Sequence, residues 1–287
     1  YFCRRTFGKK MAKLPVNLGL SCPNLDGSKG VGGCIYCSAG GGDFCSSSCL
    51  SVSEQLEEQR RLLAGKWKDA GYIAYFQAHT NTYAPARKLL PLWEEALRQP
   101  GVGGISIATR ADCLAPDILA ALEKLRSQTV LSVELGLQSV HDRTAGRINR
   151  CHTYAEFLDG LEKLRARSIP VCVHLINGLP GESREDMLES ARQIAQLDIQ
   201  AVKIRLLHVL RGTRLESEWL AGNFPLLSME EYISIVCDQL EEFPPELVIQ
   251  RLTGDGDRQK LIGPLWSRHK RAVLNGIDME LARRNSM

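Results

Sequence analysis

Several features that mark common protein classes are missing from this sequence. No apolar run approaches the ~18 residues needed to span a membrane, and no signal-peptide pattern opens the chain. These absences predict a cytoplasmic protein without membrane contacts. The sequence also contains neither a G-x-G-x-x-G dinucleotide fingerprint nor a P-loop, so neither of those nucleotide-binding classes is expected.

Disorder is also excluded by composition. Hydrophobic residues make up 44% of the chain and charged residues 24%, which is ordinary for a packed globular protein. A length of 287 residues allows one large domain, or one domain with a small extension. No internal repeat or low-complexity linker divides the chain.

The net charge of +3 is unevenly distributed. Residues 1–37 contain six basic residues and one acidic residue, and residues 251–287 contain eight basic residues and four acidic residues. The segment between them therefore carries a net charge of −6. Two basic ends on an acidic middle fit a polyanionic partner, although solvated surface charge explains the same pattern.

Short, largely apolar segments alternate with helical patterns along most of the chain. Strands covered on both faces have this composition, and we expect them at 14–20, 72–77, 104–108, 130–135, 170–176 and 201–207. Capping-box pairs predict helices that begin after Ser51 and Thr153, and a looser pair predicts one after Ser183. Six strand–helix repeats predict an α/β fold with a parallel sheet, either open and doubly wound or curved into a barrel.

The pattern changes after residue 207. We expect a helix at 229–243, a strand at 246–252 and a short helix at 268–275. These elements predict a small α/β extension at 216–287, packed on a core domain that spans 1–215.

Three cysteines with C-x11-C-x2-C spacing, Cys22, Cys34 and Cys37, follow the first expected strand. The loop between the first two is rich in glycine, which permits the backbone to approach a bulky group closely. A structural zinc ion normally takes four protein ligands, whereas a [4Fe–4S] cube held by three cysteines leaves one iron open. The spacing alone leaves three interpretations: an iron–sulfur cluster, a zinc site completed by a residue such as Cys45, or buried thiols.

The remaining cysteines carry less information. Ten cysteines in a chain of regular elements favour reduced thiols in a cytosolic protein, some of them binding metal. Cys45 and Cys49 form a C-x3-C pair, which has too few ligands for a second cluster. Cys113, Cys172 and Cys237 have apolar neighbours in the sequence, so we expect them in the core.

Five further motifs follow four successive expected strands, and two of them come after the strand at 130–135. They are residues 76–85 (FQAHTNTYAP), 105–112 (ISIATRAD), 134–139 (ELGLQS), 148–153 (INRCHT) and 178–182 (GLPGE). Together with the cysteines, this ordered set resembles the radical S-adenosylmethionine (SAM) superfamily, in the branch close to the catalytic subunit of Elongator. The resemblance covers roughly residues 14–215. One departure is Cys151, where family members usually have glycine.

The resemblance implies a partial (β/α)6 TIM-type barrel, which favours a curved sheet. It implies a [4Fe–4S] cluster on Cys22, Cys34 and Cys37, whose open iron chelates SAM. Electron transfer through the cluster then cleaves SAM to methionine and a 5′-deoxyadenosyl radical, which abstracts a hydrogen atom. An electron donor such as flavodoxin or ferredoxin is therefore expected. The length leaves no room for the acetyltransferase domain of Elongator's catalytic subunit.

The resemblance also implies SAM-binding residues at the carboxyl ends of the strands, where a parallel barrel gathers its site. Tyr36 is expected near the adenine and Arg150 at the SAM carboxylate, where a planar fork favours bidentate contact. The other expected cofactor contacts are Thr80, Asn81, Arg110, Glu134, Gln138, Gly178, Leu179 and Pro180. Ordinary structural roles compete with these assignments: loop packing for Tyr36, a turn cap at 80–81, a surface ion pair for Arg150, a buried pair for Glu134, and a strand–helix turn at 178–181.

Three functions compete. The first is a radical SAM enzyme acting on tRNA, because a small bacterial group with this cysteine spacing is linked to wobble uridines. The implied reaction converts carboxymethylaminomethyl-uridine to aminomethyl-uridine, and basic residues at both ends would contact phosphates. Candidate contacts in the extension are residues 251–255, Arg268, Lys270 and Arg271. The second function is a radical SAM enzyme acting on a small metabolite or a peptide. The third, a non-catalytic metal-stabilised RNA-binding module, leaves the ordered motifs unexplained.

Overall fold

The computed structural model describes residues 2–38, 44–67, 69–254 and 256–284. The chain falls into two compact units. Unit 1 comprises Tyr1–Pro23, Gly40–Gly136 and Ala155–Val171, and unit 2 comprises Asn24–Ala39, Leu137–Tyr154 and Cys172–Met287. The division at residue 215 into core and extension stays a prediction.

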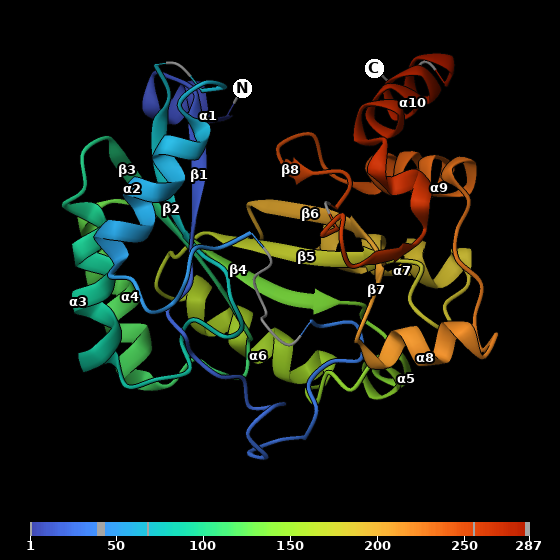
Figure 1. Cartoon of the computed structure of the whole chain (residues 1–287), viewed down its shortest axis with the longest axis horizontal. Coiled ribbons are helices and arrows are strands. Elements are labelled where there is room, and N and C mark those ends of the chain that lie inside the picture. Colours follow the sequence, from blue (N-terminus) through green and yellow to red (C-terminus); the bar gives the residue numbers. More distant parts are fainter. Residues whose placement is uncertain (1, 39–43, 68, 255, 285–287) are drawn as a thin grey trace. The chain divides into compact units, whose positions relative to one another are not determined.

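Unit 1 is built on parallel strands in the order β1-β2-β3-β4 (Figure 1). Their bounds are β1 Met11–Val16, β2 Gly71–Phe76, β3 Val102–Thr109 and β4 Val130–Gln138. Met11 pairs with Gly71 at the start of the first pair of strands, and Gly104 pairs with Val130 between β3 and β4. Parallel pairing brings the carboxyl ends of these strands to one edge, where the motifs identified in the sequence begin.

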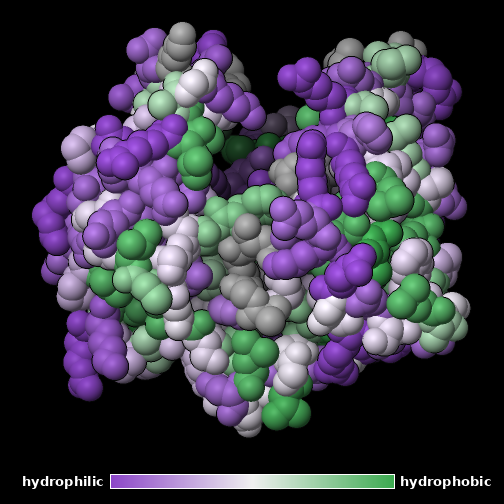
Figure 2. Space-filling view, in the orientation of Figure 1, coloured by the Kyte–Doolittle hydropathy of each residue, from purple (hydrophilic) through white to green (hydrophobic). Residues whose placement is uncertain are grey.

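Helices alternate with these strands. They are α1 Phe2–Phe7, α2 Val52–Leu63, α3 Ala86–Leu97, α4 Pro116–Gln128 and α6 Tyr154–Arg165. The expected capping box is present at α2, where Ser51 accepts from the Glu54 backbone and Glu54 accepts from the Ser51 backbone. Val52 and Leu56 of α2 are buried, whereas its outward surface is largely hydrophilic (Figure 2), with Leu62 as an exposed apolar exception. Burying such an apolar stripe is what fixes an amphipathic helix on a sheet.

Unit 2 contains the parallel strands β5 Val171–Asn177, β6 Ala201–Leu206 and β8 Val248–Arg251, in that order. A second, antiparallel pair consists of β7 Val209–Leu210 and β9 Leu261–Gly263. The helices are α5 Asp142–Arg147, α7 Arg184–Ala195, α8 Arg214–Leu220, α9 Met229–Glu242 and α10 Lys270–Arg283, with a 3-10 turn at Leu265–Arg268.

A buried pair of amides connects α9 to β5. Asn177 donates to the Gln239 side-chain oxygen (2.8 Å), and Gln239 donates to the Asn177 oxygen (3.0 Å) and to the Met187 carbonyl of α7 (2.9 Å). Both amides are at most 1% exposed. Because a buried amide without partners costs about 1–3 kcal/mol, this pairing specifies how both helices pack on the strand.

The alternation of parallel strands and helices confirms the predicted α/β class, and the fold is a partial (β/α)6 barrel of the TIM type. The capping box expected at Ser183 is also confirmed at α7. Within the described part of the chain, none of the helices has both the length and the apolar composition of a membrane span.

Three expected boundaries were wrong. The first strand is Met11–Val16 rather than 14–20, because side chains take over the hydrogen bonds of the next backbone groups. Gln55 exchanges hydrogen bonds with the backbone of Asn17, and the Asn17 side chain accepts from the Gly19 N–H. The strand expected at 246–252 is Val248–Arg251, and the last helix extends to Arg283 instead of ending at 275. The short elements α1, α8, β7 and β9 were not expected.

Candidate functional site

The cysteine motif is divided between the two units. Cys22 lies near the end of the first segment of unit 1, whereas Cys34 and Cys37 lie in unit 2. Cys34 and Cys37 share one tight turn, closed by a hydrogen bond from the Cys37 N–H to the Cys34 carbonyl (3.0 Å). All three are reduced thiols; Cys22 and Cys34 are half-buried and Cys37 is exposed. Unit 2 therefore presents two accessible sulfur donors side by side, which suits a metal centre.

Ile35, between the last two cysteines, anchors the turn. Its N–H donates to the Ile148 carbonyl (3.1 Å), and its carbonyl accepts from the Leu215 N–H at the start of α8 (2.9 Å). The Ile35 side chain is 1% exposed and belongs to an apolar cluster that also includes Leu179. Burying a side chain of this size contributes roughly 1.5–3 kcal/mol. The core of unit 2 therefore fixes the backbone that carries Cys34 and Cys37.

Tyr36, the other residue between these cysteines, is half-buried and packs against the same apolar cluster. Burial holds the pKa of its phenol well above the usual range, and the nearby thiols of Cys34 and Cys37 raise the pKa further. The positive charge of Arg150 acts in the opposite direction. Tyr36, Arg150 and the two thiols are thus brought together within unit 2. The expected contact of Tyr36 with adenine stays a prediction.

Two asparagines tie this loop to the turn after α5. Asn24 is fully buried, and its Nδ2 donates to the carbonyls of Asn149 (2.7 Å) and Arg150 (2.9 Å). In the other direction, Asn149 Nδ2 donates to the carbonyls of Gly33 (2.8 Å) and Val31 (3.1 Å). We call this reciprocal arrangement of Asn24 and Asn149 the asparagine clasp. It holds the backbone immediately before Cys34.

Arg150 is an internal cation. Its side chain is 1% exposed, and Nη1 donates to the carbonyls of Leu137 and Ser139, while Nε donates to the His152 carbonyl (3.0 Å). Nη2 lies 3.8 Å from the exposed carboxylate of Asp142. The surface ion pair considered from the sequence is therefore not the main role of Arg150. Contact with the SAM carboxylate stays a prediction.

The structure shows how a cysteine is accommodated at position 151, where family members usually have glycine. Its φ is +57°, a conformation that favours glycine. Its Sγ lies against Gly30 of the cysteine loop: a Cβ built on Gly30 would approach that sulfur to 2.6 Å. The absence of a side chain at position 30 therefore provides the space that the cysteine occupies.

The turn after β5 begins at Gly178, whose φ is +85° and whose N–H lies 3.2 Å from Met187 Sδ. Leu179 and Pro180 are buried, so the strand–helix turn considered from the sequence is present. Gln138, the last residue of β4, has a φ of +63°. The cofactor contacts expected for these four residues stay predictions.

In unit 1, Thr80 and Asn81 follow β2 and are 2% and 0% exposed. Asn81 Nδ2 donates to the carbonyls of Ala78 (3.1 Å) and Ala108 (3.0 Å), and its N–H also donates to Ala108 (3.2 Å). Asn81 therefore joins the end of β2 to the end of β3. The buried Oδ1 of Asn81 accepts no hydrogen bond, so this atom is still able to accept one from a ligand. A contact of either residue with the methionine part of SAM stays a prediction.

Arg110 follows β3 and forms two hydrogen bonds with Asp112, from Nε (2.9 Å) and Nη2 (2.8 Å). Burial would lower the pKa of Arg110, but the Asp112 carboxylate and the thiols of Cys22 and Cys113 outweigh it, so the pKa lies above its usual value. Because the Cys22 thiol contributes to the raised pKa of Arg110, the positive charge of Arg110 lies near Cys22. A direct contact between Arg110 and the cofactor stays a prediction.

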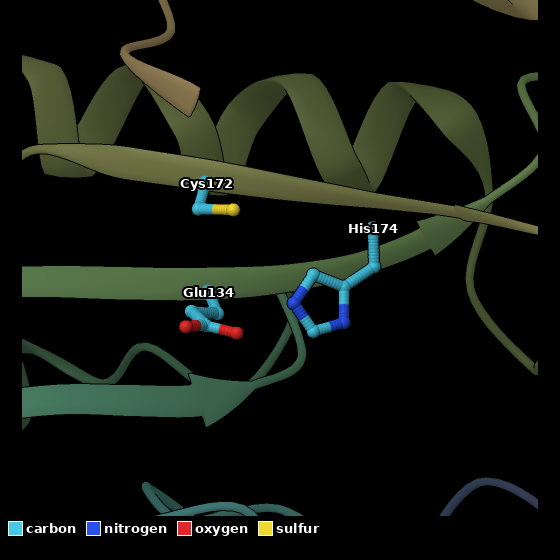
Figure 3. A group of neighbouring side chains, drawn as sticks. All are labelled: Glu134, Cys172 and His174. Carbon is cyan, nitrogen blue, oxygen red and sulfur yellow. The ribbon is translucent and has the colours of Figure 1, made fainter. Parts of the chain in front are cut away.

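Glu134 of β4 is fully buried (Figure 3). Its Oε1 lies 2.5 Å from Lys13 Nζ of β1 and accepts from Ser106 Oγ of β3 (2.6 Å). The buried structural pair considered from the sequence is therefore present, and binding of ribose stays a prediction. Figure 3 also labels Cys172 and His174, which project from the same face of β5. Cys172 and Cys237 are buried, as expected for core thiols, whereas Cys113 is only half-buried.

The sequence did not identify the partners that hold these residues. Asn24 and Lys13 carried no distinctive pattern, because loop asparagines and single polar strand residues are common in any fold. Ser106 and Asp112 were visible only as members of the ISIATRAD motif. Asn149 was visible only as part of the INRCHT motif. Asp112 was the most accessible of these from sequence, since it lies two residues after Arg110 in ISIATRAD.

A three-cysteine motif after the first strand of a partial (β/α)6 barrel is the combination that defines a class of iron–sulfur enzymes. The sequence matches the family model described as "Radical SAM superfamily" over residues 29–194, and the "Radical_SAM C-terminal domain" over residues 199–283. The chain belongs to the radical SAM superfamily.

Relatives and solved structures agree with this assignment. The chain is 47% identical over 287 residues to YtqA of Bacillus subtilis (strain 168), covering 100% of this chain and 89% of that protein. It is 33% identical over 267 residues to YhcC of Escherichia coli (strain K12), covering 93% and 85%. The solved archaeal Methanocaldococcus infernus Elp3 superposes with a TM-score of 0.72 at 18% identity, covering 95% of this chain and 63% of that structure. At this low identity, the likeness to Elp3 shows only that the two folds are similar.

The family establishes the cofactors. The protein is a radical SAM enzyme, and it uses a [4Fe–4S] cluster and SAM. The arrangement in unit 2 fits the cluster, because two reduced thiols share a turn that the protein core holds in place. Of the three interpretations left open by the cysteine spacing, the family favours the iron–sulfur cluster, and its assignment to Cys22, Cys34 and Cys37 stays a prediction.

The contact between Gly30 and Cys151 predicts a compensating pair of substitutions. Gly30→Ala should lower the free energy of unfolding by roughly 1–3 kcal/mol, because the new methyl group overlaps the Cys151 sulfur. Adding Cys151→Gly should restore most of this loss, since it removes the sulfur and suits the positive φ. Urea unfolding of the iron-free protein measures both changes. A double variant no more stable than Gly30→Ala would show that the overlap is not the cause.

Proposed function

We propose that Cys22, Cys34 and Cys37 hold the [4Fe–4S] cluster and leave one iron for the amino and carboxylate groups of SAM. The observation that carries this assignment is the C-x11-C-x2-C motif in a chain that belongs to the radical SAM superfamily. The chemistry supplied by the bound cofactors is the reductive cleavage of SAM to methionine and a 5′-deoxyadenosyl radical.

The residues near these cysteines would hold SAM rather than react with it. The backbone of Gly178, Leu179 and Pro180 and the ring of Tyr36 are the proposed adenine contacts, and Arg150 is the proposed partner of the SAM carboxylate. Thr80, Asn81, Arg110, Glu134 and Gln138 complete the proposed set. The structural hydrogen bonds of Asn81, Arg110 and Glu134 support the proposal, because side chains already fixed by the fold lose little freedom when they bind a ligand.

Substitution of one cysteine tests this assignment. The wild-type protein, reconstituted without oxygen, should be brown, with about four irons per chain and broad absorbance near ~400 nm. Cys34→Ala should lose the colour and all SAM cleavage. Cys3→Ala is the control, because Cys3 lies outside the motif, and it should keep both. A Cys34→Ala variant that keeps stoichiometric iron and full cleavage would overturn the ligand assignment.

We further propose that the substrate is a tRNA wobble uridine that carries a carboxymethylaminomethyl group. Support comes from the motif set, which resembles the Elongator-like branch, and from the likeness in fold to archaeal Elp3. An anticodon base splayed from its stack would enter the end of the barrel where the motifs gather. A cytoplasmic location and an electron donor such as flavodoxin or ferredoxin belong to the same proposal.

The proposed reaction balances without an external oxidant. Removing the carboxymethyl group as glyoxylate consumes one water, releases two electrons from the substrate and leaves an aminomethyl group on the uridine. Reductive cleavage of SAM to methionine and 5′-deoxyadenosine takes up two electrons. The substrate would thus supply both electrons that SAM cleavage takes up, so the overall reaction would need no net reductant.

The two basic ends of the chain differ in how much of their charge is available to RNA. In the C-terminal region, Arg283 is held by Glu280, Arg284 by Glu280 and Asp238, and Arg268 donates to backbone carbonyls. Arg271 is exposed. In the stretch 251–255, Asp255 lies outside the described residues. Carboxylates paired in this way neutralise positive charge that would otherwise attract phosphates.

At the N-terminal end, Lys13 is paired with Glu134, but other basic residues are exposed. Arg4 of α1 and Lys9 and Lys10, just before β1, are all exposed, in a segment with few acidic residues. Phosphate contacts from such side chains supply affinity that does not depend on sequence. The N-terminal basic residues are therefore the better-supported RNA contacts of the two groups.

Nucleoside analysis tests the substrate. A strain without the gene should accumulate carboxymethylaminomethyl-uridine in total tRNA and lose the aminomethyl form that its parent contains. A plasmid copy of the wild-type gene should restore the parent pattern, whereas a Cys34→Ala copy should not. Unchanged wobble uridines in the deletion strain would reject the tRNA substrate and leave a small metabolite or a peptide.

Salt dependence of binding tests the charge assignment. Replacing Arg4 and Lys10 with alanine should weaken tRNA binding and flatten the plot of log affinity against log salt by up to about two units of slope, because each phosphate contact contributes about 0.9. Arg283→Ala, which removes a charge already held by Glu280, should leave the slope unchanged. If Arg283→Ala had the larger effect, the RNA would contact the C-terminal region instead.

A further inference from the structure

The fully buried side chain of Asn24 makes a contact that the clasp alone does not require. Besides the carbonyls of Asn149 and Arg150, Asn24 Nδ2 also donates toward Cys34 Sγ, at 3.5 Å. This distance is normal for an N–H···S hydrogen bond, since sulfur is larger than oxygen. The two amide hydrogens of Asn24 therefore have at least three acceptors, so at least one hydrogen is shared between two of them.

The backbone geometry makes this contact a fixed one. The Gly33 N–H donates to the Asn24 carbonyl (2.9 Å), and the Gly33 carbonyl accepts from Asn149. Both backbone polar groups of Gly33, the residue before Cys34, are therefore hydrogen-bonded to the two asparagines of the clasp. Gly33 also has a φ of +71°, and a Cβ there would approach Leu25 Cδ2 to 3.0 Å. Cys34 thus has little freedom to move away from the Asn24 amide.

We propose that Asn24 is a positioning residue that donates a hydrogen bond to the Cys34 ligand sulfur and raises the reduction potential of the cluster. The inference rests on the proposed function, in which Cys34 ligates the cluster. A donor aimed at a thiolate stabilises negative charge on it, and that charge is larger in the reduced state. Because Asn24 is fully buried, water has little access to the donor side of this hydrogen bond. Asn24 therefore favours reduction, which is the step that precedes cleavage of SAM.

Asn149 provides a matched control. It forms the other half of the clasp, but its side-chain amide donates to the backbone carbonyls of Val31 and Gly33 rather than to a cysteine sulfur. Its φ of +55° is one that glycine adopts readily, so Asn149→Gly removes the amide without straining the backbone. This variant removes two hydrogen bonds from the clasp and leaves the hydrogen bond to sulfur.

Redox titration of the reconstituted proteins, followed by electron paramagnetic resonance of the reduced cluster, tests the proposal. Asn24→Ala should shift the reduction potential to more negative values, whereas Asn149→Gly should keep the wild-type potential. An unchanged potential in Asn24→Ala, or an equal shift in Asn149→Gly, would overturn the proposal. A wild-type protein that takes up no cluster would instead reject the proposed function.

A second measurement applies even if Asn24→Ala fails to take up iron. Wild-type protein carrying 15N only in asparagine side chains should show a 15N coupling to the reduced cluster in pulsed electron paramagnetic resonance. The coupling should persist in Asn149→Gly and in Asn81→Ala, and it should vanish in Asn24→Ala or Asn24→Asp. No coupling in the wild-type protein, or its loss in Asn149→Gly or Asn81→Ala, would show that Asn24 does not contact the cluster.

Discussion

The hydrogen bonds of the asparagine clasp are the constraint on which the unit 2 part of the site depends. They join the cysteine loop to the turn that carries Asn149 and Arg150. Ile35 adds an apolar anchor between the two cysteines of unit 2. A loop rich in glycine has high conformational entropy when unfolded, so an ordered arrangement of thiols requires bonds of this kind. The core of unit 2, rather than the metal alone, therefore sets the backbone of the cysteine turn.

The charged residues associated with the site are paired before any cofactor binds. Arg110 is held by Asp112, Glu134 by Lys13 and Ser106, and Arg150 by backbone carbonyls. Buried charges without partners cost several kcal/mol, so such pairing is what permits them to remain inside the fold. Its consequence for function is rigidity: a side chain that already has fixed partners can present its remaining atoms in one orientation.

The sequence predicted the architecture well and the site unevenly. Five of the six core strands lie within three residues of their expected bounds, because apolar runs between helical patterns identify buried parallel strands. The first strand was placed too late, because the Asn17–Gln55 bonds that end it are contacts between distant residues. The cysteines and Arg150 were visible from spacing and motif. The burial of Arg150 and the role of Asn24 were not, because both depend on which backbone carbonyls the fold brings near them.

The separation in sequence between the two halves of the clasp affects when the cysteine loop can form. Asn24 binds the carbonyl of Asn149, 125 residues later in the chain. During synthesis on the ribosome, the loop therefore emerges long before the turn that orders it, and the clasp cannot form until Asn149 has been made. A cluster bound by these cysteines would meet an ordered loop only after that point.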